Sequence, residues 1–555
     1  MEKAFELYSL WRKQALPEGL AEELNSIENN KEEIQDRFCS HMKFGTSGLR
    51  GIMGAGTARM NSVVIKRATL GIADYLLEKR ENPVIAISYD TRKNSRQYAL
   101  LTAEILSKRG IHTLIMAQPQ PVPLLSFAVK QMGLNGGIMI TASHNLKEYN
   151  GYKVYDSKGN QIDDDKARLV EKYIGAHGYF EEIEEAAVKG SIKEVPAEII
   201  RDYSSNIMKN VLWWDEEEAC RKVMADFSVT YTPLNGTGLA HAVAVMEALG
   251  IGNINIVSRQ TDGDGEFTTC PSPDPDNESA FGEALREHED KQADIILATD
   301  PDSDRVGVMV LRNGRYEKLS GNQVGELVCD YICSCRNDLE GKWMFKSLAS
   351  SPAVEIIAKS HGLNVGNTLT GFKNIALEME KLKAQGREND FVLGFEESLG
   401  YLYGTYTRDK DAVMGCQLIC LAAAKCRAEG ITLADRLQQI YEKYGYIESR
   451  TWSKKFEKEK DRLLISELME KLFKGRMESI GTEALEIDRS LEEKNVFQAS
   501  AGAHKIMIRP SGTELKLKFY VFAKGSGRDE AAATAEMILN ELKEYTEKMI
   551  NERES

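Results

Sequence analysis

The chain has 555 residues, 42% of them hydrophobic and 28% charged, which is ordinary for a globular protein and long enough for several domains. Its net charge of −14 disfavours nonspecific binding to nucleic acid or to an anionic membrane, and its longest apolar run, 413–424, is too short to span a bilayer. Nine scattered cysteines without zinc-type pairs, and a first segment without the apolar core of a secretory signal, predict a cytoplasmic protein. No obligate protein partner can be identified from the sequence.

The opening residues predict a charged helical extension that lies outside any core. From residue 41 to about 190, strand patterns alternate with helical patterns, as in 84–90 followed by a helix to about 106. This alternation predicts an α/β fold with a mainly parallel sheet. A weak echo between the strands that end at Asp90 and at Asp300 suggests repeated α/β units.

A glycine-rich segment at 44–51 carries Arg50. It lacks the Gly-Lys-Thr ending of a nucleotide-binding P-loop, so we do not expect a nucleotide there.

The segment Thr141-Ala-Ser-His-Asn145 follows an apolar run at 136–140, which predicts a buried strand that delivers Ser143 to a loop. Serine is a weak nucleophile unless a base or a nearby cation activates it. Thr141 and Asn145 stand where a nucleophile elbow needs glycine, so the esterase arrangement is excluded. The activating group must therefore come from another part of the chain.

A second strand pattern at 293–300 leads into Asp300-Pro-Asp-Ser-Asp-Arg305. Carboxylates at alternate positions of an extended loop point to one side, and hard oxygen ligands suit Mg²⁺ better than zinc. Arg305 would complete a site for a phosphate that bridges to the metal. The pair Asp262 and Asp264 opens like a calcium loop, but Phe267 occupies the position that needs glycine, and we discount it.

The C-terminal part predicts half-buried strands at 505–508 and 516–522, followed by a helix that begins at Asp529. Between the two strands, 509–514 combines a guanidinium, two hydroxyls and exposed amides, which is typical of an anion-binding turn. The loops at 370–373 and 394–398 add a lysine and further polar groups after apolar runs.

The serine segment, the aspartate loop, 396–398 and 509–513 follow one another in the order and spacing of the α-D-phosphohexomutases. Over nearly its whole length the chain resembles this phosphoglucomutase/phosphomannomutase family, and the loops at 44–51 and 231–238 are most similar to the phosphoglucomutase-2 type. The resemblance implies three similar α/β domains and a C-terminal α+β domain around a central cleft. We therefore expect an N-terminal helical extension and four domains, with bounds 1–40, 41–200, 201–315, 316–435 and 436–555.

The same resemblance implies a role for each residue of the site. Ser143 would carry the catalytic phosphoryl group, and Ser143, Asp300, Asp302 and Asp304 would hold Mg²⁺. The implied substrate is a phosphorylated sugar, with glucose 1,6-bisphosphate as intermediate and activator. Glu396 and Ser398 would meet sugar hydroxyls, the non-reacting phosphate would lie on Arg509, Ser511, Gly512 and Thr513, and the basic lining would be Arg50, His144, Lys153, Arg305 and Lys373.

Three positions depart from the family pattern. Leu146 and Leu515 stand where proline is usual, and Asn235 replaces the histidine of Pro-Leu-His-Gly. None of them removes the nucleophile or a metal ligand, so they bear on loop rigidity and substrate preference rather than on the reaction class.

The implied activity is that of a phosphosugar mutase, an intramolecular phosphotransferase of the isomerase class. Phosphoserine 143 would pass its phosphoryl group to a sugar hydroxyl and then recover the other phosphoryl group from the bisphosphate. Lys153 and His144 are both candidates for the base that takes the hydroxyl proton. The sequence 396–398 favours glucose phosphate, with mannose and pentose phosphates as alternatives.

Two other classes of protein compete with this prediction. An aspartyl-phosphate phosphatase would use Asp300 as its nucleophile, but it expects threonine or valine where Asp304 stands. A sugar-phosphate-binding protein without catalysis would not need the complete carboxylate trio.

Overall fold

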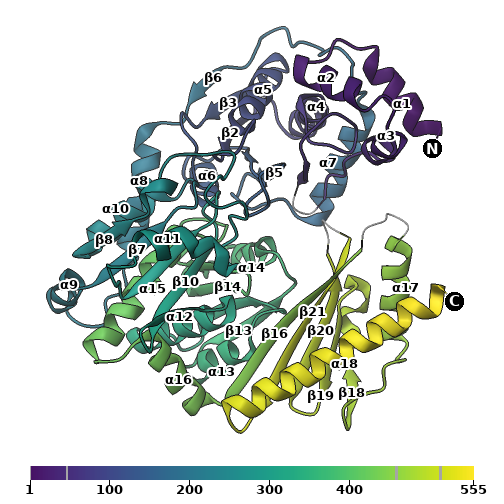
Figure 1. Cartoon of the computed structure of the whole chain (residues 1–555). Coiled ribbons are helices and arrows are strands. Elements are labelled where there is room, and N and C mark those ends of the chain that lie inside the picture. The colour runs from purple at the N-terminus through teal and green to yellow at the C-terminus, as the bar shows by residue number, and fades with distance from the viewer. Residues whose placement is uncertain (1, 46–47, 457–460, 512–514, 555) are drawn as a thin grey trace.

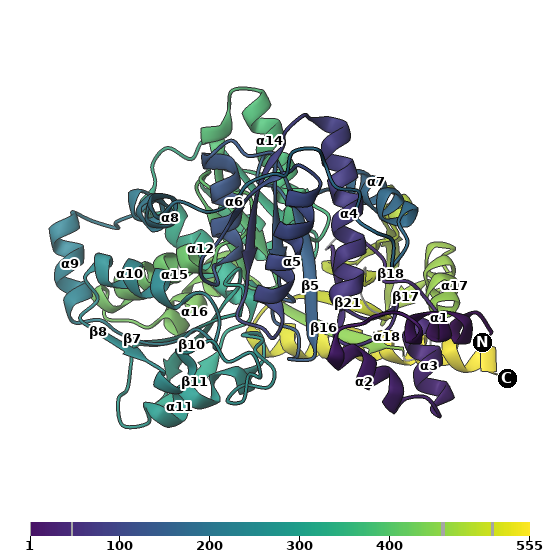
Figure 2. The same ribbon diagram turned by 90° about the horizontal axis from the view of Figure 1, so that it is seen from above.

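The computed structural model describes residues 2–45, 48–456, 461–511 and 515–554. Four β-sheets, each covered by helices, follow one another along the chain and are arranged in an arc (Figure 1). The view from above shows the same succession, from the N-terminal helices through the first sheet to the C-terminal helix (Figure 2).

Three short helices open the chain: α1 (Glu2–Arg12), α2 (Glu18–Ser26) and α3 (Lys31–Phe38). They were expected to be an appendage outside any core, but they share a small core with Ala55 and Val63 of the first domain. At its centre the Trp11 ring meets Phe38 and Phe180 edge-on at 5.6 and 5.3 Å. The aromatic residues in this charged segment recur at helical spacing, so their burial outweighs the charged composition.

The first sheet has the order β1-β5-β4-β2-β3-β6. Its strands β2, β3, β4 and β6 are parallel, as predicted, whereas β5 runs antiparallel to both β4 and β1. The connection from β4 to β5, 141–148, is shorter than the roughly dozen residues that a parallel crossover needs. The elements are α4 (Ser62–Lys79), α5 (Ser95–Lys108), α6 (Val122–Gln131), α7 (Asp164–Ala176), β1 (Leu49–Ile52), β2 (Val84–Tyr89), β3 (His112–Ile115), β4 (Gly136–Ile140), β5 (Tyr149–Asp156) and β6 (Ile192–Glu194).

The second sheet, β11-β10-β9-β7-β8, repeats the same plan. Strands β8, β7 and β9 are parallel, and β10 returns antiparallel to β9. Its elements are α8 (Ala197–Lys209), α9 (Glu217–Ala225), α10 (Leu239–Leu249), α11 (Gly282–Glu287), η1 (Ser258–Gln260), η2 (Glu278–Phe281), β7 (Ser228–Thr232), β8 (Asn253–Ile256), β9 (Ile295–Thr299), β10 (Val306–Arg312) and β11 (Arg315–Lys318).

The third sheet, β13-β12-β14-β15, is built in the same way, with β15 antiparallel to β14. The buried helix α15 packs between the second and third sheets and shares one continuous core with both. The elements are α12 (Gly321–Cys335), α13 (Pro352–Ser360), α14 (Phe372–Ala384), α15 (Ala412–Ala428), α16 (Leu433–Tyr444), η3 (Glu388–Asp390), β12 (Trp343–Ser347), β13 (Asn364–Thr368), β14 (Phe391–Glu396) and β15 (Gly400–Tyr403).

The last sheet, β16-β21-β20-β19-β18-β17, is antiparallel throughout and is covered by the long helix α18. The predicted apolar face of that helix, including Ile538, Leu542 and Met549, lies in the core of this domain. The elements are β16 (Tyr446–Lys455), β17 (Ser479–Ile480), β18 (Glu483–Ile487), β19 (Phe497–Ala501), β20 (His504–Pro510), β21 (Lys516–Gly525), α17 (Asp461–Phe473), α18 (Arg528–Glu554) and η4 (Arg489–Lys494).

Four of the loops that the sequence marks as functional join two antiparallel strands. The serine segment lies between β4 and β5, the aspartate loop between β9 and β10, and 397–399 between β14 and β15. The loop after Pro510 joins β20 to β21 in the same way. The first three are therefore equivalent positions of one repeated α/β unit.

All nine cysteines lie among the described residues, and none of them forms a disulfide. Across the described ranges, no helix combines the length and the apolar composition that crossing a membrane would require.

Candidate functional site

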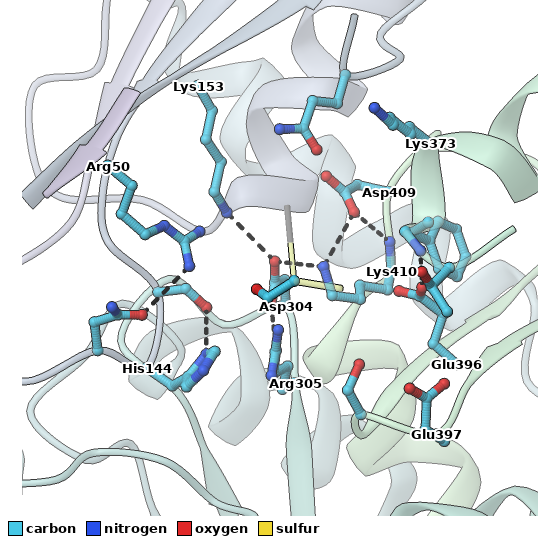
Figure 3. A pocket seen from close by; sticks show the side chains of 18 of the residues that line it. Arg50, His144, Lys153, Asp304, Arg305, Lys373, Glu396, Glu397, Asp409 and Lys410 are labelled. Atoms are coloured by element: carbon cyan, nitrogen blue, oxygen red, sulfur yellow. Dashed lines mark hydrogen bonds and ion pairs between the residues drawn. The ribbon is translucent and has the colours of Figure 1, made fainter. Parts of the chain in front are cut away.

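A cavity of about 280 Å³ lies where loops of all four sheets converge. Its cationic side chains outnumber its carboxylates eight to four, although the whole chain carries a net charge of −14. Figure 3 shows Arg50 and Lys153 reaching in from one side of the cavity, and Lys410 and Glu396 from the other. The cations are Arg50, Lys153, Arg305, Lys373, Lys410, Arg509, Lys516 and Lys518, and the carboxylates are Asp304, Glu396, Glu397 and Asp409. Such a cavity is suited to a multiply charged anion.

Ser143 lines this cavity and is 2% exposed. Its φ of 54° lies in the left-handed region, which costs a non-glycine residue about 1–3 kcal/mol. The Ser143 backbone N–H donates to Thr141 Oγ1 at 2.8 Å, and the Ser143 hydroxyl donates to Asp300 Oδ2 at 2.8 Å. The strained turn thus aims the serine of the first domain at the aspartate loop of the second.

The three aspartates fit a divalent cation. Asp300, Asp302 and Asp304 are buried, and one oxygen of each lies within 4.8 Å of the others. Asp302 Oδ1 and Asp304 Oδ1 are buried without a hydrogen-bond partner, which is costly unless a cation binds them. Asp300 accepts the backbone N–H groups of Asp304 and Arg305 at 3.1 and 3.0 Å, so the loop holds its own ligands in place.

Two lysines face the same carboxylates from other domains. Lys153 Nζ lies 2.8 Å from Asp302 Oδ2 and 3.6 Å from Asp304 Oδ2, and Lys410 Nζ lies 2.7 Å from Asp304 Oδ2. Burial lowers the pKa of Lys410, but Asp304 and Asp409 raise it by more, so the net shift is upward. Burial, together with the neighbouring carboxylates, raises the pKa of Asp300 well above its usual value.

Lys410 was not predicted as a site residue. It belongs to a segment, 404–411, that joins β15 to α15 and packs against the first domain. The Tyr155 hydroxyl donates to Asp409 at 2.7 Å, and the Arg408 backbone N–H donates to Ser126 Oγ at 3.0 Å. A run of four charged residues after a strand looks like solvated surface in a sequence, yet all four, 408–411, are buried here.

The wall formed by the third domain carries the predicted Glu396 and Lys373. Glu396 is 6% exposed, and its burial raises its pKa to about 7. Glu396 Oε1 accepts the Gly371 backbone N–H at 2.6 Å, which ties the two loops of this wall together. Lys373 forms an ion pair with Asp164 of the first domain, and Ser398 lines the cavity beside them.

The fourth domain contributes Arg509 and Ser511, as predicted. Arg509 Nη2 donates to the Tyr520 hydroxyl at 3.3 Å, and the Ser511 backbone N–H donates to the carbonyl of Lys516 at 2.8 Å. Lys516 and Lys518 also line the cavity, and neither was predicted as a site residue. Their alternate positions on β21 place them on one face of the strand, and this spacing is the signal that could have identified them. The predicted Gly512 and Thr513 lie outside the described residues.

His144 and Arg50 lie beside the serine. His144 Nδ1 is 3.2 Å from Ser143 Oγ, and burial, aided by Arg305 and Arg50, lowers the pKa of its imidazole well below the usual value. Arg50 Nη1 donates to Asn145 Oδ1 at 3.3 Å. Arg305 Nε lies 3.7 Å from Asp304 Oδ1. The described residues of the predicted site therefore line one cavity, except Asp300 and Asp302, which contact the lining residues Ser143 and Lys153.

The three departures from the family pattern have different surroundings. Asn235 is buried at a φ of 59°, a conformation that asparagine tolerates well, and its amide donates to the carbonyl of Asp262 at 2.9 Å. Leu146 is 47% exposed beside the serine turn. Leu515 packs partly against the core of the fourth domain.

Comparison with protein families matches three segments of the chain. Residues 41–179, 201–314 and 320–444 match alpha/beta/alpha domains I, II and III, respectively, of phosphoglucomutase/phosphomannomutase.

Curated relatives and solved structures agree with these matches. The chain is 32% identical over 522 residues to a phosphoglucomutase of Staphylococcus aureus, covering 90% of this chain and 93% of the relative, and 33% identical over 507 residues to one of Staphylococcus haemolyticus, covering 87% and 90%. A putative phosphomannomutase from Thermus thermophilus superposes with a TM-score of 0.69 at 22% identity, covering 92% of this chain and 99% of that one. The phosphoglucomutase parafusin from Paramecium, in an open form, superposes with a TM-score of 0.67 at 17% identity, covering 92% of this chain and 95% of that one.

Proposed function

Because the chain belongs to the phosphoglucomutase/phosphomannomutase family of α-D-phosphohexomutases, and is therefore a phosphosugar mutase of the isomerase class, we propose that it interconverts glucose 1-phosphate and glucose 6-phosphate. The reaction would pass through phosphoserine 143 and glucose 1,6-bisphosphate. Glucose phosphate is favoured over mannose and pentose phosphates because the relatives at 32–33% identity are phosphoglucomutases. We expect the reaction to take place in the cytoplasm, where nine free cysteines would stay reduced.

One observation carries the proposal: the Ser143 hydroxyl lies 2.8 Å from Asp300, and Ser143 lines the same cavity as Arg509. A phosphoryl group on the serine would lie next to the carboxylate trio, and a second phosphate would meet the cations of the fourth domain. That separation of two anion sites suits a substrate that bears one phosphate and accepts another.

In the first half-reaction the bond between phosphorus and Ser143 Oγ breaks, a sugar hydroxyl oxygen bonds to phosphorus, and a base removes the hydroxyl proton. Ser143, Asp300, Asp302 and Asp304 would hold Mg²⁺, which when bound neutralises charge on the transferring phosphoryl group. Arg305 and Lys410 place further positive charge at this end, and electrostatic stabilisation of this kind dominates phosphoryl transfer. His144, beside Ser143, and Lys153, beside Asp302, are both candidates for the base.

The bisphosphate must then turn over before the second half-reaction. Arg509, with Lys516 and Lys518, would hold whichever phosphate is not reacting, and Glu396 and Ser398 would bind sugar hydroxyls. Because a guanidinium and two ammonium groups recognise a phosphate rather than a sugar face, this end of the cavity accepts both orientations.

A phosphatase that uses Asp300 as its nucleophile has less support. Asp300 Oδ2 accepts the Ser143 hydroxyl, and Oδ1 accepts two backbone N–H groups of its own loop. Both oxygens are therefore engaged in hydrogen bonds, and neither is directed at an incoming phosphate.

The proposal is tested by comparing kcat/KM for glucose 1-phosphate, mannose 1-phosphate and ribose 1-phosphate in the presence of Mg²⁺ and the corresponding bisphosphate. We expect the glucose substrate to have the highest value. A preference for mannose or ribose phosphate would overturn the sugar assignment, and undiminished activity in Asp302→Asn would overturn the assigned chemistry.

A further inference from the structure

Arg92 is a buried arginine in the loop that follows β2, and the proposed mechanism does not use it. Its side chain is inaccessible to solvent, and so is that of Asp90, whose Oδ2 lies 3.3 Å from Arg92 Nε. A guanidinium carries five N–H donors, and burying them is costly unless each meets an acceptor.

Arg92 Nε makes no hydrogen bond, since its contact with Asp90 is an ion pair only, whereas the four N–H groups on Nη1 and Nη2 all meet backbone carbonyls between Ser143 and Tyr149. Nη2 donates to the carbonyl of Ser143 at 2.6 Å and to that of Asn145. Nη1 donates to the carbonyl of Leu146 at 2.8 Å and to that of Tyr149 at 3.3 Å. One side chain thus binds four carbonyls of the hairpin loop and fixes the directions of four peptide groups.

These peptide groups decide where the serine hydroxyl points. Ser143 adopts a left-handed φ of 54°, a conformation that persists only where its surroundings impose it. The Ser143 N–H is held by Thr141 on one side, and its carbonyl is held by Arg92 on the other. Because both peptide groups are fixed, the direction of the Cα–Cβ bond is fixed, and from there Oγ reaches Asp300 Oδ2 at 2.8 Å.

The second domain covers Arg92 from the opposite side. The Phe267 ring lies 4.9 Å from the guanidinium carbon and is fully buried, in the loop that connects η1 to η2. The neighbouring Glu266 pairs with Lys93 and, at 3.0 Å, with Lys147 of the serine loop. Phe267, which argues against a calcium loop in the sequence, therefore packs over the buried Arg92.

We infer that Arg92 is a positioning residue for Ser143, and that Phe267 couples this positioning to the docking of the second domain. The inference rests on the proposed function, because it assigns Ser143 as the phosphoryl carrier. Arg92 contacts neither sugar nor phosphate in this account; it keeps the serine turn in the one conformation that faces the carboxylate trio.

The test compares Arg92→Ala, Arg92→Lys and Phe267→Ala with the wild type and with Arg109→Ala. Arg109 is a matched control in the same domain, since it forms a partly buried ion pair with Asp74 at 2.7 Å and does not line the cavity. The measurements are kcat, KM, the fraction of Ser143 that becomes phosphorylated by glucose 1,6-bisphosphate, and the release of inorganic phosphate when water replaces the sugar as acceptor.

We expect Arg92→Ala to lower kcat by about 10²-fold, because a small displacement of reacting groups has such an effect, while KM changes by less than about threefold. Arg92→Lys should also be impaired, since one ammonium cannot bind four carbonyls in fixed directions. Phe267→Ala should show a smaller decrease, and each variant should lose a larger share of its phosphoserine to water. Added guanidinium ion, well below denaturing concentrations, should restore part of the activity of Arg92→Ala and none to Ser143→Ala.

Equal kcat in Arg92→Ala, Arg92→Lys and the wild type would overturn the inference. If Arg92→Ala does not fold, Phe267→Ala tests the inference in its place. An unchanged kcat in that variant, together with an unchanged share of phosphoserine lost to water, would count against a coupling between Phe267 and the position of Ser143. Phosphorylation of Ser143 is read by mass spectrometry and does not depend on which sugar is used. If the wild-type enzyme prefers another sugar phosphate, the proposed substrate is contradicted. The role of Arg92 is then tested by the same comparison of variants with the preferred sugar phosphate.

Discussion

Lys410 illustrates how buried charges build this site. Its ammonium lies 2.7 Å from Asp304 of the second domain, while the segment that carries it is held to the first domain by Tyr155 and Asp409. A buried charge is tolerated only with close partners, so Lys410 and the carboxylates stabilise one another. In the sequence, 408–411 has the composition of an exposed turn, and only the packing of three domains shows otherwise.

Replacing Lys410 by methionine removes this charge and keeps most of the volume. We expect kcat/KM to fall by about 10²-fold, the effect of removing one group that stabilises a developing charge. Lys425→Met is the control, because Lys425 lies on α15 of the same domain, pairs with Glu429 near the surface and does not line the cavity. Steady-state rates of the two variants within a factor of about three of each other would contradict this role.

Among elements, α12 carries an acid in an unusual setting. Glu326 is 2% exposed, and one of its oxygens accepts the hydroxyl of Ser351, the N-cap of α13, at 2.7 Å. Burial raises its pKa from 4.5 to about 7. Between these two values the folded protein binds more protons than the unfolded chain, so stability falls as the pH rises through this window.

Glu326→Gln should remove this pH dependence. Above pH 7 the variant is expected to be more stable than the wild type by about 1–3 kcal/mol, and below pH 4.5 the difference should vanish. The measurement is the thermal unfolding midpoint of both proteins across this pH range. A variant that is less stable than the wild type at pH 8 would show that the carboxylate is needed in its charged form.

The crossing of α4 and α7 depends on Gly71. A Cβ added there would lie 2.5 Å from the backbone nitrogen of Ile174, which cannot move without shifting the helix. Alanine favours a helix by about 1 kcal/mol over glycine, but overpacking against backbone costs about 1–3 kcal/mol.

We therefore expect Gly71→Ala to lower the unfolding midpoint, although alanine is the better helix former. Gly175→Ala, in α7 itself, is the matched control, because its Cβ would have nothing within 4 Å. That control should leave the midpoint unchanged or raise it. Equal unfolding midpoints for the two variants would mean that α4 and α7 can move apart to accommodate the added methyl group at little cost.

At the level of secondary structure, part of the fold could be predicted from the sequence. Strands β4 and β9, the polar loops after them and the helix from Asp529 follow from apolar periodicity and turn residues, and the structure confirms them. The echo between the strands that end at Asp90 and at Asp300 predicted repeated α/β units, which the structure confirms, but these two strands are not equivalent members of the repeat. Strand order makes β2 equivalent to β7 and β4 equivalent to β9, and such pairing across a sheet is not encoded in local pattern.

At the level of single side chains, the sequence predicts those that carry recognisable motifs and misses those that act through tertiary contacts. Arg92, Lys410 and Lys518 have no motif of their own, and their positions depend on which loops meet. The predicted residues 512–513 lie outside the described residues, and their roles stay predictions, as do the four domain boundaries.

For the whole molecule, the arc of four domains brings the fourth sheet round toward the first domain (Figure 1), and Arg509 of the fourth domain lines the same cavity as Ser143 of the first. The fourth domain has its own core and meets the third through a separate apolar cluster around Ala349, Met507 and Tyr520. Gly445, with a φ of 99°, precedes β16 and links the two domains. Such an arrangement allows the fourth domain to move as a unit.

We expect substrate to draw the fourth domain toward the first, because Arg509 and the lysines of β21 would share one bisphosphate with the serine end. Small-angle scattering should show a smaller radius of gyration with glucose 1,6-bisphosphate than without it. Arg509→Ala should lose this change and have a raised KM. An identical scattering curve with and without saturating ligand in the wild type would argue for a rigid cleft.

The central claim is that Ser143 carries the phosphoryl group opposite the three aspartates. It is tested most directly by incubating the protein with glucose 1,6-bisphosphate and locating the phosphate by peptide mass spectrometry. We predict an acid-stable phosphate on Ser143 that disappears when glucose 6-phosphate accepts it, and no phosphate in Ser143→Ala. An acid-labile phosphate on Asp300, or a phosphate on any other residue with Ser143 unmodified, would contradict the account.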